Sequence, residues 1–195
     1  MTLDDDRIRR QPAALAGIVA DTAALSFTMI SETNVGALLS VLAASKPASR
    51  LLELGTGTGH GTAWMLDGMD AASTLDTVDS DERVVAVARR HLGGDARVRF
   101  HVRDGGEFLG SSEPGQFDLI YADAWPGKFS HLDAALALLR PGGMYVIDDL
   151  LPQPNWPDGH APKVPALVED IERRAEFATV KMAWASGLMM VVRRV

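Results

Sequence analysis

Residues 53–59, with the sequence E-L-G-T-G-T-G, have the composition and spacing of a ligand-binding loop. The preceding residues 51–54 predict a short buried strand, and a helix is expected from about residue 60 to residue 66. Glycines between a strand and a helix let the backbone lie close to a ligand without a Cβ in the way, and the start of the helix offers free N–H groups. The segment therefore predicts a cofactor loop, and the alternative is a tight turn that binds no ligand.

The glycine spacing separates two types of cofactor. Enzymes that bind dinucleotides carry G-x-G-x-x-G beneath a pyrophosphate, but His60 breaks that pattern here. Three alternate glycines with an acidic residue two positions before them suit a ligand with an amino-acid tail, because Glu53 can meet its ammonium group directly or through water. The expected cofactor contacts in this loop are Glu53, Gly55, Thr56, Gly57 and Gly59.

An acidic residue also follows the second predicted strand, residues 75–78. Asp79 lies roughly 20 residues past the glycines, where a carboxylate binds a ribose diol in α/β folds. Ser80 beside it is a further expected cofactor contact, and Asp81 is the second candidate for the ribose. Either aspartate can instead cap the helix predicted over residues 81–91.

The third predicted strand, residues 98–102, is followed by Asp104 and Gly105. Both are expected cofactor contacts, because the Asp104 carboxylate can accept a hydrogen bond from an adenine amino group. The same carboxylate can equally cap the turn that follows. The sequence leaves these two roles open.

The elements that position these residues alternate between strands and helices. Strands are predicted over residues 51–54, 75–78, 98–102, 117–122 and 144–147, and an apolar helix after the fourth ends near residue 139. This alternation is typical of a parallel sheet that is buried on both faces. Residues 177–184 and 188–192 predict a closing hairpin, whereas a simple dinucleotide-binding domain would continue with another crossover helix.

Two helices are predicted before the sheet and one long irregular segment after its fifth strand. The first helix covers about residues 12–25, and the second runs from the candidate N-cap Ser31 to the break at Pro47. Their apolar faces are candidates for packing a second copy in a homodimer. Residues 151–165 contain five prolines and are expected over the carboxyl edge of the sheet, where α/β folds bind ligands.

Composition and charge exclude several function classes. The formal net charge is −7 and no run of Lys or Arg exceeds two residues, so the clustered basic footprint of a nucleic-acid-binding protein is missing. The absence of cysteine excludes disulfides, thiolate catalysis and cysteine zinc sites. Residues 1–6 are acidic rather than signal-like, and no apolar stretch is long enough for a bilayer. We expect one cytoplasmic α/β domain over residues 1–195, with helices in 1–46, the core in 50–195, and no nucleic-acid or membrane partner.

With these motifs, the stretch from about residue 29 to residue 192 resembles the cation-dependent O-methyltransferases, the family of catechol and caffeoyl-CoA O-methyltransferases. The resemblance is strongest in residues 51–60, 117–124 and 138–149. It implies a Rossmann-like class I methyltransferase fold, with a seven-stranded, mostly parallel sheet ending in an antiparallel hairpin. The glycine segment then implies S-adenosylmethionine (SAM) as the cofactor.

The resemblance also implies a divalent cation, usually Mg²⁺, held by Asp123, Asp148 and Asp149. Three carboxylates at the ends of adjacent strands would repel one another without a cation, and oxygen ligands suit Mg²⁺. Asp149 stands where the family more often has Asn. The alternative is that only Asp123 and Asp148 face the site and shape the substrate pocket without a metal.

The resemblance places a catalytic lysine shortly after the fourth strand, but Lys128 lies two positions later than the family usually has it. Lys128 therefore either reaches the site as the proton acceptor or is a solvated loop lysine. Asp123 is the other expected catalytic residue and also a cofactor contact. Trp125, Trp156 and His160 are expected to line the substrate pocket, although Trp156 can instead pin its loop to the domain.

These features predict SAM-dependent methyl transfer to a hydroxyl of a small molecule, with a cation lowering the pKa of that hydroxyl. Three alternatives stay open: a metal-independent methyltransferase, a SAM-binding protein without catalysis, and a NAD(P)-dependent oxidoreductase. The sequence does not identify the methyl acceptor.

Overall fold

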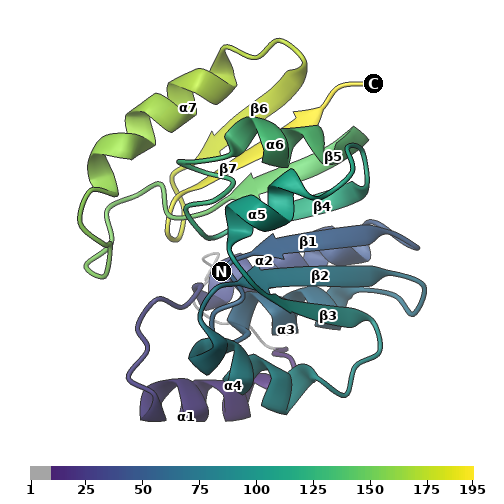
Figure 1. Cartoon of the computed structure of the whole chain (residues 1–195), viewed down its shortest axis with the longest axis vertical. Helices are drawn as coiled ribbons and strands as arrows, with labels where there is room; N and C mark the ends of the chain where they lie inside the picture. Colours follow the sequence, from purple (N-terminus) through teal and green to yellow (C-terminus); the bar gives the residue numbers. More distant parts are fainter. Residues whose placement is uncertain (1–9) are drawn as a thin grey trace, which may run out of the picture.

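Seven strands form one mixed sheet in the computed structural model, which describes residues 10–195 (Figure 1). Their order across the sheet is β3-β2-β1-β4-β5-β7-β6. The strands are β1 (Arg50–Leu54), β2 (Thr74–Asp79), β3 (Val98–Val102), β4 (Phe117–Ala122), β5 (Leu139–Ile147), β6 (Phe177–Met182) and β7 (Leu188–Arg193). β1 to β5 pair in parallel, and β7 is antiparallel to both β5 and β6. The predicted fold class and the closing hairpin are therefore confirmed.

Helices cover both faces of the sheet, which explains why the central strands are apolar on both sides. One face packs against α1 (Leu15–Ala24), α2 (Thr33–Ala44), α3 (His60–Gly68) and α4 (Glu82–Leu92). The other packs against α5 (Gly105–Gly110), α6 (Leu132–Ala137) and α7 (Val164–Glu172). Figure 1 shows α5 and α6 in front of the strands and α2 and α3 behind them.

Strand register brings the candidate site residues to one edge. Leu54 of β1 pairs with Val78 of β2 and with Ala122 of β4, and Ala122 pairs with Ile147 of β5. Because these four residues form one row across the sheet, the residues that follow them lie side by side at the carboxyl edge. Those following residues are Gly55, Asp79, Asp123 and Asp148.

Three helices differ from the prediction. α6 is shorter than expected, because residues 125–130 first form a hydrogen-bonded turn. α7 begins within the segment predicted to be irregular, where Pro165 occupies the first turn, a position that needs no N–H donor. α5 was not predicted, since three of its six residues are glycine, which disfavours a helix. η1, a short 3₁₀ helix (Ala161–Lys163), precedes α7.

The candidate N-cap Ser31 is also corrected. α2 begins at Thr33 with Glu32 at its N-cap and no side-chain cap, and the Ser31 hydroxyl instead donates to Asp123.

β5 begins at Leu139 rather than residue 144, with residues 140–143 bulging out of the register with β4. The prediction for residues 1–6 lies outside the described residues, and so do the first nine residues of the predicted N-terminal region 1–46. Within residues 10–195, no helix combines the length and apolarity needed to cross a membrane.

Candidate active site

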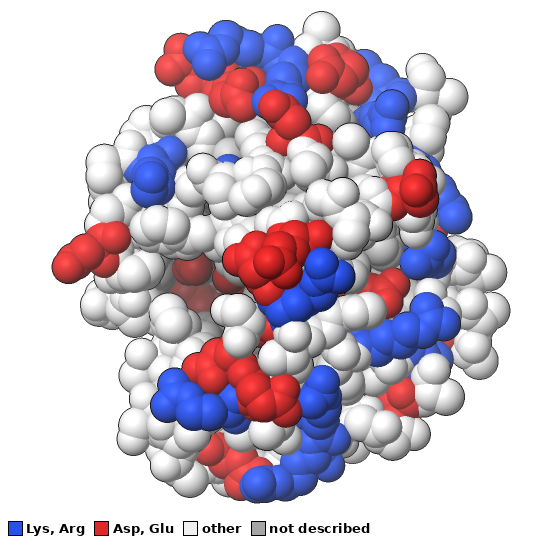
Figure 2. All heavy atoms as spheres, viewed as in Figure 1, with Lys and Arg blue, Asp and Glu red and all other residues white. Residues whose placement is uncertain are grey.

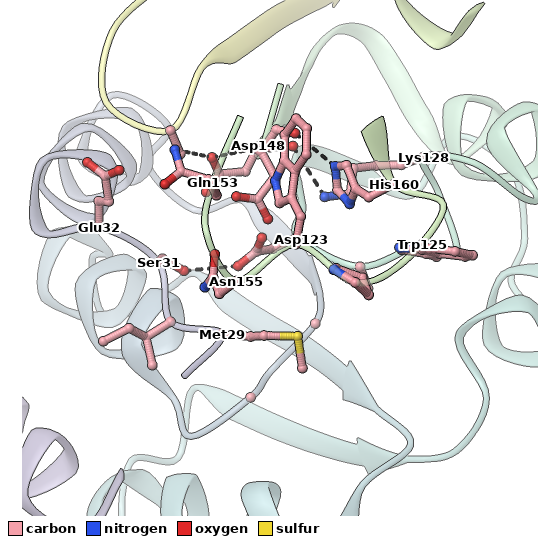
Figure 3. Close-up of a pocket in the computed structure, with 18 of the residues that line it drawn as sticks. Met29, Ser31, Glu32, Asp123, Trp125, Lys128, Asp148, Gln153, Asn155 and His160 are labelled. Carbon is pink, nitrogen blue, oxygen red and sulfur yellow. Dashed lines mark hydrogen bonds between the residues drawn. The ribbon is translucent and has the colours of Figure 1, made fainter. Parts of the chain in front are cut away.

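A cavity of about 360 Å³ lies at the carboxyl edge of the sheet, where β1, β2, β4 and β5 end (Figure 3). Its lining comes from the loops after these strands, from two further segments, residues 27–32 and 153–160, and from Ser186 in the turn between β6 and β7. The Asn155 side-chain amide donates a hydrogen bond of 2.9 Å to the Thr28 carbonyl. This bond joins the two segments, which are distant in sequence, on the outer side of the sheet edge.

The glycine loop forms one side of the cavity. Gly55 and Gly57 line it, with φ values of 105° and 50°. A Cβ on Gly55 would lie 2.9 Å from the carbonyl oxygen of Asp123, so only glycine lets the loops after β1 and β4 approach this closely. Thr56 and Gly59 are buried and do not line the cavity. These two expected contacts shape the loop instead.

Glu53 does not reach the cavity. Its side chain is fully buried under the loop, where one oxygen accepts hydrogen bonds from the hydroxyls of Thr62 and Thr77. Its other oxygen, Oε1, is buried and has no hydrogen-bond partner among residues 10–195. Burial raises the pKa of Glu53 to about 7. A direct contact with a cofactor ammonium group is therefore not supported, and Glu53 ties β1 to β2 and α3.

Asp79 lines the cavity and also fastens the glycine loop. One carboxylate oxygen accepts from the Gly57 amide at 2.9 Å, and the other from the Asp81 amide at 3.0 Å. Asp81 caps α4 by accepting from the Arg83 amide at 2.9 Å, which is the capping role left open for it. Ser80 is exposed and does not line the cavity.

Asp104 and Gly105 lie away from the cavity. The Asp104 carboxylate accepts a hydrogen bond of 2.9 Å from the Glu107 amide and caps α5. Gly105 packs against Pro126, where a Cβ on the glycine would lie 2.9 Å from the proline Cβ. Of the two roles left open for Asp104, the structure supports the cap.

Asp148 lies at the centre of a hydrogen-bond network. It is 1% exposed. Its Oδ2 accepts from the Tyr121 hydroxyl at 2.5 Å, while Oδ1 accepts from the Asp149 amide at 2.7 Å and from the Ser186 hydroxyl. Both oxygens are therefore engaged by donors from β4, from the loop after β5 and from the β6–β7 hairpin. This network fixes the carboxylate in one orientation.

Asp123 and Asp149 are the other carboxylates of this cluster. Burial, and next the charge of Asp148, raises the pKa of both, and the charge of Lys128 acts in the opposite direction. The Ser31 hydroxyl donates to Asp123 at 3.0 Å. Neighbouring carboxylates repel one another, so each of these groups is harder to ionise than an isolated one. A cationic ligand bound beside them would offset this repulsion.

Lys128 is a buried residue of the cavity wall, with 3% exposure, and its ammonium group donates to the Asp148 carbonyl at 3.2 Å. A turn takes up the two extra residues before it: the Lys128 and Phe129 amides both donate to the Trp125 carbonyl, at 3.0 and 2.9 Å. Gly127 adopts φ 91°, and its carbonyl accepts from Tyr145 beneath it at 2.8 Å. Lys128 therefore reaches the site and is not a solvated loop lysine.

Mg²⁺ does not fit this donor set as the resemblance implied. Both oxygens of Asp148 already accept hydrogen bonds, and the ammonium of Lys128 lies beside the same residue. In the part of the chain that the structure describes, no group of three or more acidic, histidine or cysteine side chains is arranged to hold a metal ion. The aspartates thus form a cluster that is compensated by a lysine.

The three expected pocket residues come together in the cavity wall. Trp156 stacks on His160 with ring centroids 4.2 Å apart, and Trp125 lies 5.8 Å from Phe129 in an edge-to-face arrangement. All of the predicted members, Trp125, Trp156 and His160, line the cavity. Trp156 therefore both lines the pocket and packs its own loop.

Several lining residues were not predicted. Glu32, Gln153 and Asn155 face the cavity from the two outer segments, and Figure 3 shows them around its opening. Ser31 and Ser186 bind the aspartates from positions 92 and 38 residues away in sequence. Polar residues in loops carry no local pattern that indicates such long-range partners.

A methyltransferase-domain family matches residues 52–150, about half of the chain. This stretch includes the glycine loop, Asp79, Asp123 and Lys128, and it ends just past the acidic pair after β5. The chain belongs to this family. The match thus covers the strand ends that build the floor of the cavity, while the two outer segments lie outside it.

Relatives with curated names agree with this membership. A protein of Mycolicibacterium vanbaalenii, named provisionally as an O-methyltransferase, is 36% identical over 118 residues, which are 58% of this chain and 52% of that protein. A catechol O-methyltransferase of Mycobacterium tuberculosis is 29% identical over 153 residues, 76% of this chain and 70% of its own length. The matched part of the chain spans about half the length of relatives such as the first.

Solved structures of methyltransferases share the fold. The O-methyltransferase of Bacillus cereus, crystallised with S-adenosylhomocysteine (SAH), superposes with a TM-score of 0.82 at 20% identity, over 97% of this chain and 94% of that one. This likeness confirms that the whole described chain, including the terminal hairpin, follows the methyltransferase fold.

Proposed function

We propose that this chain is a SAM-dependent O-methyltransferase that acts on a small molecule without a divalent cation. The proposal is supported most by one cavity that is bounded on one side by Gly55, Gly57 and Asp79 and on the other by Lys128 and aromatic rings. The first side suits a nucleoside cofactor with an amino-acid tail, and the second suits the reacting group of a planar acceptor. The O-methyltransferase relatives and the SAH bound to the B. cereus enzyme support the same assignment.

When bound, SAM would supply a sulfonium methyl group to an attacking oxygen. Asp79 would hold the ribose hydroxyls, because its carboxylate lies on the cavity beside the glycine loop and each of its oxygens accepts only one hydrogen bond from the described residues, which leaves a lone pair for a hydroxyl donor. Asp123 and Asp148 would favour the cationic cofactor over its neutral-sulfur product. Lys128 would stabilise the negative charge that develops on the acceptor oxygen, since its ammonium group is buried and held by Asp148.

The position of Lys128 supports a metal-free reaction. A cation polarises the acceptor oxygen in metal-dependent enzymes, and here an ammonium group stands next to the carboxylates that would hold such a cation. We expect turnover to survive dialysis against EDTA and to gain less than about twofold from added Mg²⁺. Abolition by EDTA with recovery on Mg²⁺ would overturn the metal-free part alone.

Calorimetry tests the cofactor. SAM and SAH should bind with one site per chain, and NAD should not bind at equal concentration, in keeping with the terminal hairpin and His60. Transfer is then measured by mass spectrometry, as SAH formation and methyl gain across a panel of hydroxylated small molecules. Tight SAM binding with no transfer to any member would instead support a SAM-binding protein without catalysis.

The size and charge of the same cavity indicate which class of molecule it accepts. A cavity of about 360 Å³ suits small molecules rather than a macromolecule, and the acidic lining disfavours nucleic acid. A homodimer through α1 and α2 stays a prediction, for which the exposed side chains of Val19 and Val41 are candidates. Light scattering during size-exclusion chromatography would measure the oligomeric state.

A further inference from the structure

A second cavity, of about 500 Å³, lies between α6 and the segment that forms η1 and α7. Its lining includes Lys128 and Phe129 from the turn after β4, Leu132 from α6 and Leu167 from α7. Lys128 also lines the cavity at the carboxyl edge of the sheet, hereafter the first cavity. Because one buried side chain belongs to both walls, the two cavities adjoin at Lys128.

The volume of the first cavity limits what it can hold. Methyl transfer needs the cofactor and the acceptor bound at the same time, and a single drug-sized ligand occupies a pocket of roughly 300 to 1,000 Å³. The first cavity, at about 360 Å³, is near the lower end of that range, so SAM alone would occupy most of it. The bulk of the acceptor therefore needs further space, and the second cavity supplies that space beside Lys128.

The partition between the two cavities consists of side-chain contacts. Phe129 lines the second cavity, and its ring meets His160 at 4.8 Å and Trp125 at 5.8 Å, both edge to face. His160 and Trp125 belong to the wall of the first cavity. Edge-to-face aromatic contacts are individually weak, and Phe129 is only partly buried. A rotation of this ring would therefore open the partition without unfolding the elements around it.

The chemistry of the second cavity differs from that of the first. Its floor is apolar, with Leu167 buried and Leu132 partly buried against the same core cluster. Among the described residues of its lining, the two acidic side chains are Asp133 and Asp170, and both form ion pairs with Nη2 of Arg174, at 2.6 and 2.8 Å. Because these carboxylates are already compensated, the lining suits an uncharged, apolar group.

We propose that the second cavity binds the body of the methyl acceptor, and that this acceptor is an elongated hydroxylated molecule with an uncharged apolar tail. This inference rests on the proposed function. The hydroxyl reaches Lys128 at the boundary of the two cavities, and the methyl donor approaches from the first. The tail lies between α6 and α7 over Leu132 and Leu167, and Phe129 rotates to admit it.

Photo-crosslinking with 4-hydroxybenzophenone tests the site directly, because this probe has a hydroxyl at one end and an apolar ring beyond its photoreactive ketone. The SAH complex is irradiated with the probe and digested with trypsin, which cuts after Lys163 and Arg173 and so releases residues 164–173 as one peptide. This peptide contributes to the lining of the second cavity but not to that of the first. We expect the adduct on this peptide, at Ala166 or Leu167.

The variant Ala166→Trp fills the second cavity and leaves the first unchanged, since Ala166 is exposed and lines only the second. Calorimetry on the SAH complex should show binding of 4-hydroxybenzophenone weakened at least about 10-fold, with the Kd for SAH within about twofold of wild type. Ala175→Trp is the matched control, because Ala175 is exposed, follows α7 and lines neither cavity. It should bind the probe as wild type does. Unchanged SAH binding also shows that each variant is folded, and the wild-type crosslinking result stands without them.

Three results would overturn the inference: adducts confined to residues 27–32 and 153–160, equal binding of the probe to Ala166→Trp and Ala175→Trp, or no binding of the probe to the SAH complex. The first of these would place the acceptor wholly in the first cavity. Failure of the proposed function has a different signature, because SAH would then not bind in calorimetry before any probe is added.

Discussion

Lys128 places an ammonium group in a cavity that is lined by five carboxyl residues. Removing it would leave the acceptor oxygen without a neighbouring cation, while the glycine loop and Asp79 stay intact. We predict that Lys128→Met lowers turnover about 100-fold or more, with the Kd for SAM within about threefold. Lys163→Met is the matched control, since Lys163 is exposed and lies over the Trp125 ring. Equal losses in both variants would argue against a role at the reacting atoms.

Glu53 makes stability depend on pH. Its pKa is raised from 4.5 to about 7 in the folded protein by burial, so the folded state retains a proton that the unfolded state releases. The stabilisation is complete below the unfolded pKa and is lost as pH rises towards the folded pKa. We predict a loss of about 3 kcal/mol in the free energy of unfolding across this window.

The variant Glu53→Gln isolates that contribution, because its amide does not ionise. Urea unfolding between pH 4.5 and pH 7.5 should show a smaller decline for this variant than for wild type. The exposed Glu107→Gln variant should keep the wild-type decline. An unchanged profile in Glu53→Gln would show that another group causes the dependence.

At the scale of elements, the turn between β4 and α6 decides where Lys128 lies. Gly127 within it has φ 91°, and a Cβ there would come within 2.5 Å of Leu54 and 2.6 Å of the Tyr145 hydroxyl. Gly142 in the bulge of β5 has φ 76° but open space around it. An alanine at either position would therefore meet the same kind of backbone strain, but only at residue 127 would its Cβ also clash with neighbouring atoms.

We predict that Gly142→Ala costs about 1 kcal/mol through strain alone, whereas Gly127→Ala costs about 3 kcal/mol because overpacking is added. Urea denaturation measures both. Gly127→Ala should also reduce turnover by displacing Lys128, while Gly142→Ala should not. Equal losses of unfolding free energy in the two variants would mean that the turn accommodates the extra methyl group. The turn would then not determine the position of Lys128.

Elements with strong local patterns were predictable, and those set by tertiary packing were not. β1, β4 and the second half of β5 contain apolar runs, and the positions of the five parallel strands agree with the prediction to within a few residues, apart from the start of β5. α7 was missed because Pro165 and the four prolines that precede the helix suggest irregular chain, yet Leu167 and Ile171 bury their side chains in the core. Burial of the apolar helix face thus outweighed the local signal.

At the scale of the whole molecule, the lining of the cavity is predominantly acidic. Among residues 10–195, the charged side chains of its lining are five carboxyl groups and one ammonium group: Glu32, Asp79, Asp123, Asp148, Asp149 and Lys128. Figure 2 shows acidic side chains at the bottom of the hollow on the left of the molecule. The charges of Asp148 and Asp149, after burial itself, raise the pKa of Glu32. An anionic acceptor would therefore meet repulsion on entry.

We predict that the SAH complex binds para-hydroxybenzamide about 10-fold more tightly than para-hydroxybenzoate at low salt, because these probes differ mainly in charge. The gap should narrow as salt is added and in the variant Glu32→Gln. Calorimetry of the two probes gives both measurements. Tighter binding of the benzoate would contradict the prediction and indicate an acidic acceptor.

The sequence by itself determined the sheet class, the cofactor loop and the strand-end aspartates, because these depend on local patterns and on parallel strands ending at one edge. Only the tertiary structure decided which of these side chains face the cavity. Glu53 turns inward to Thr62 and Thr77, while Lys128 is brought in by a turn. His160 is held in the cavity wall by the backbone carbonyl of a residue 11 positions earlier. Such roles arise from contacts between segments distant in sequence, and no local pattern encodes them.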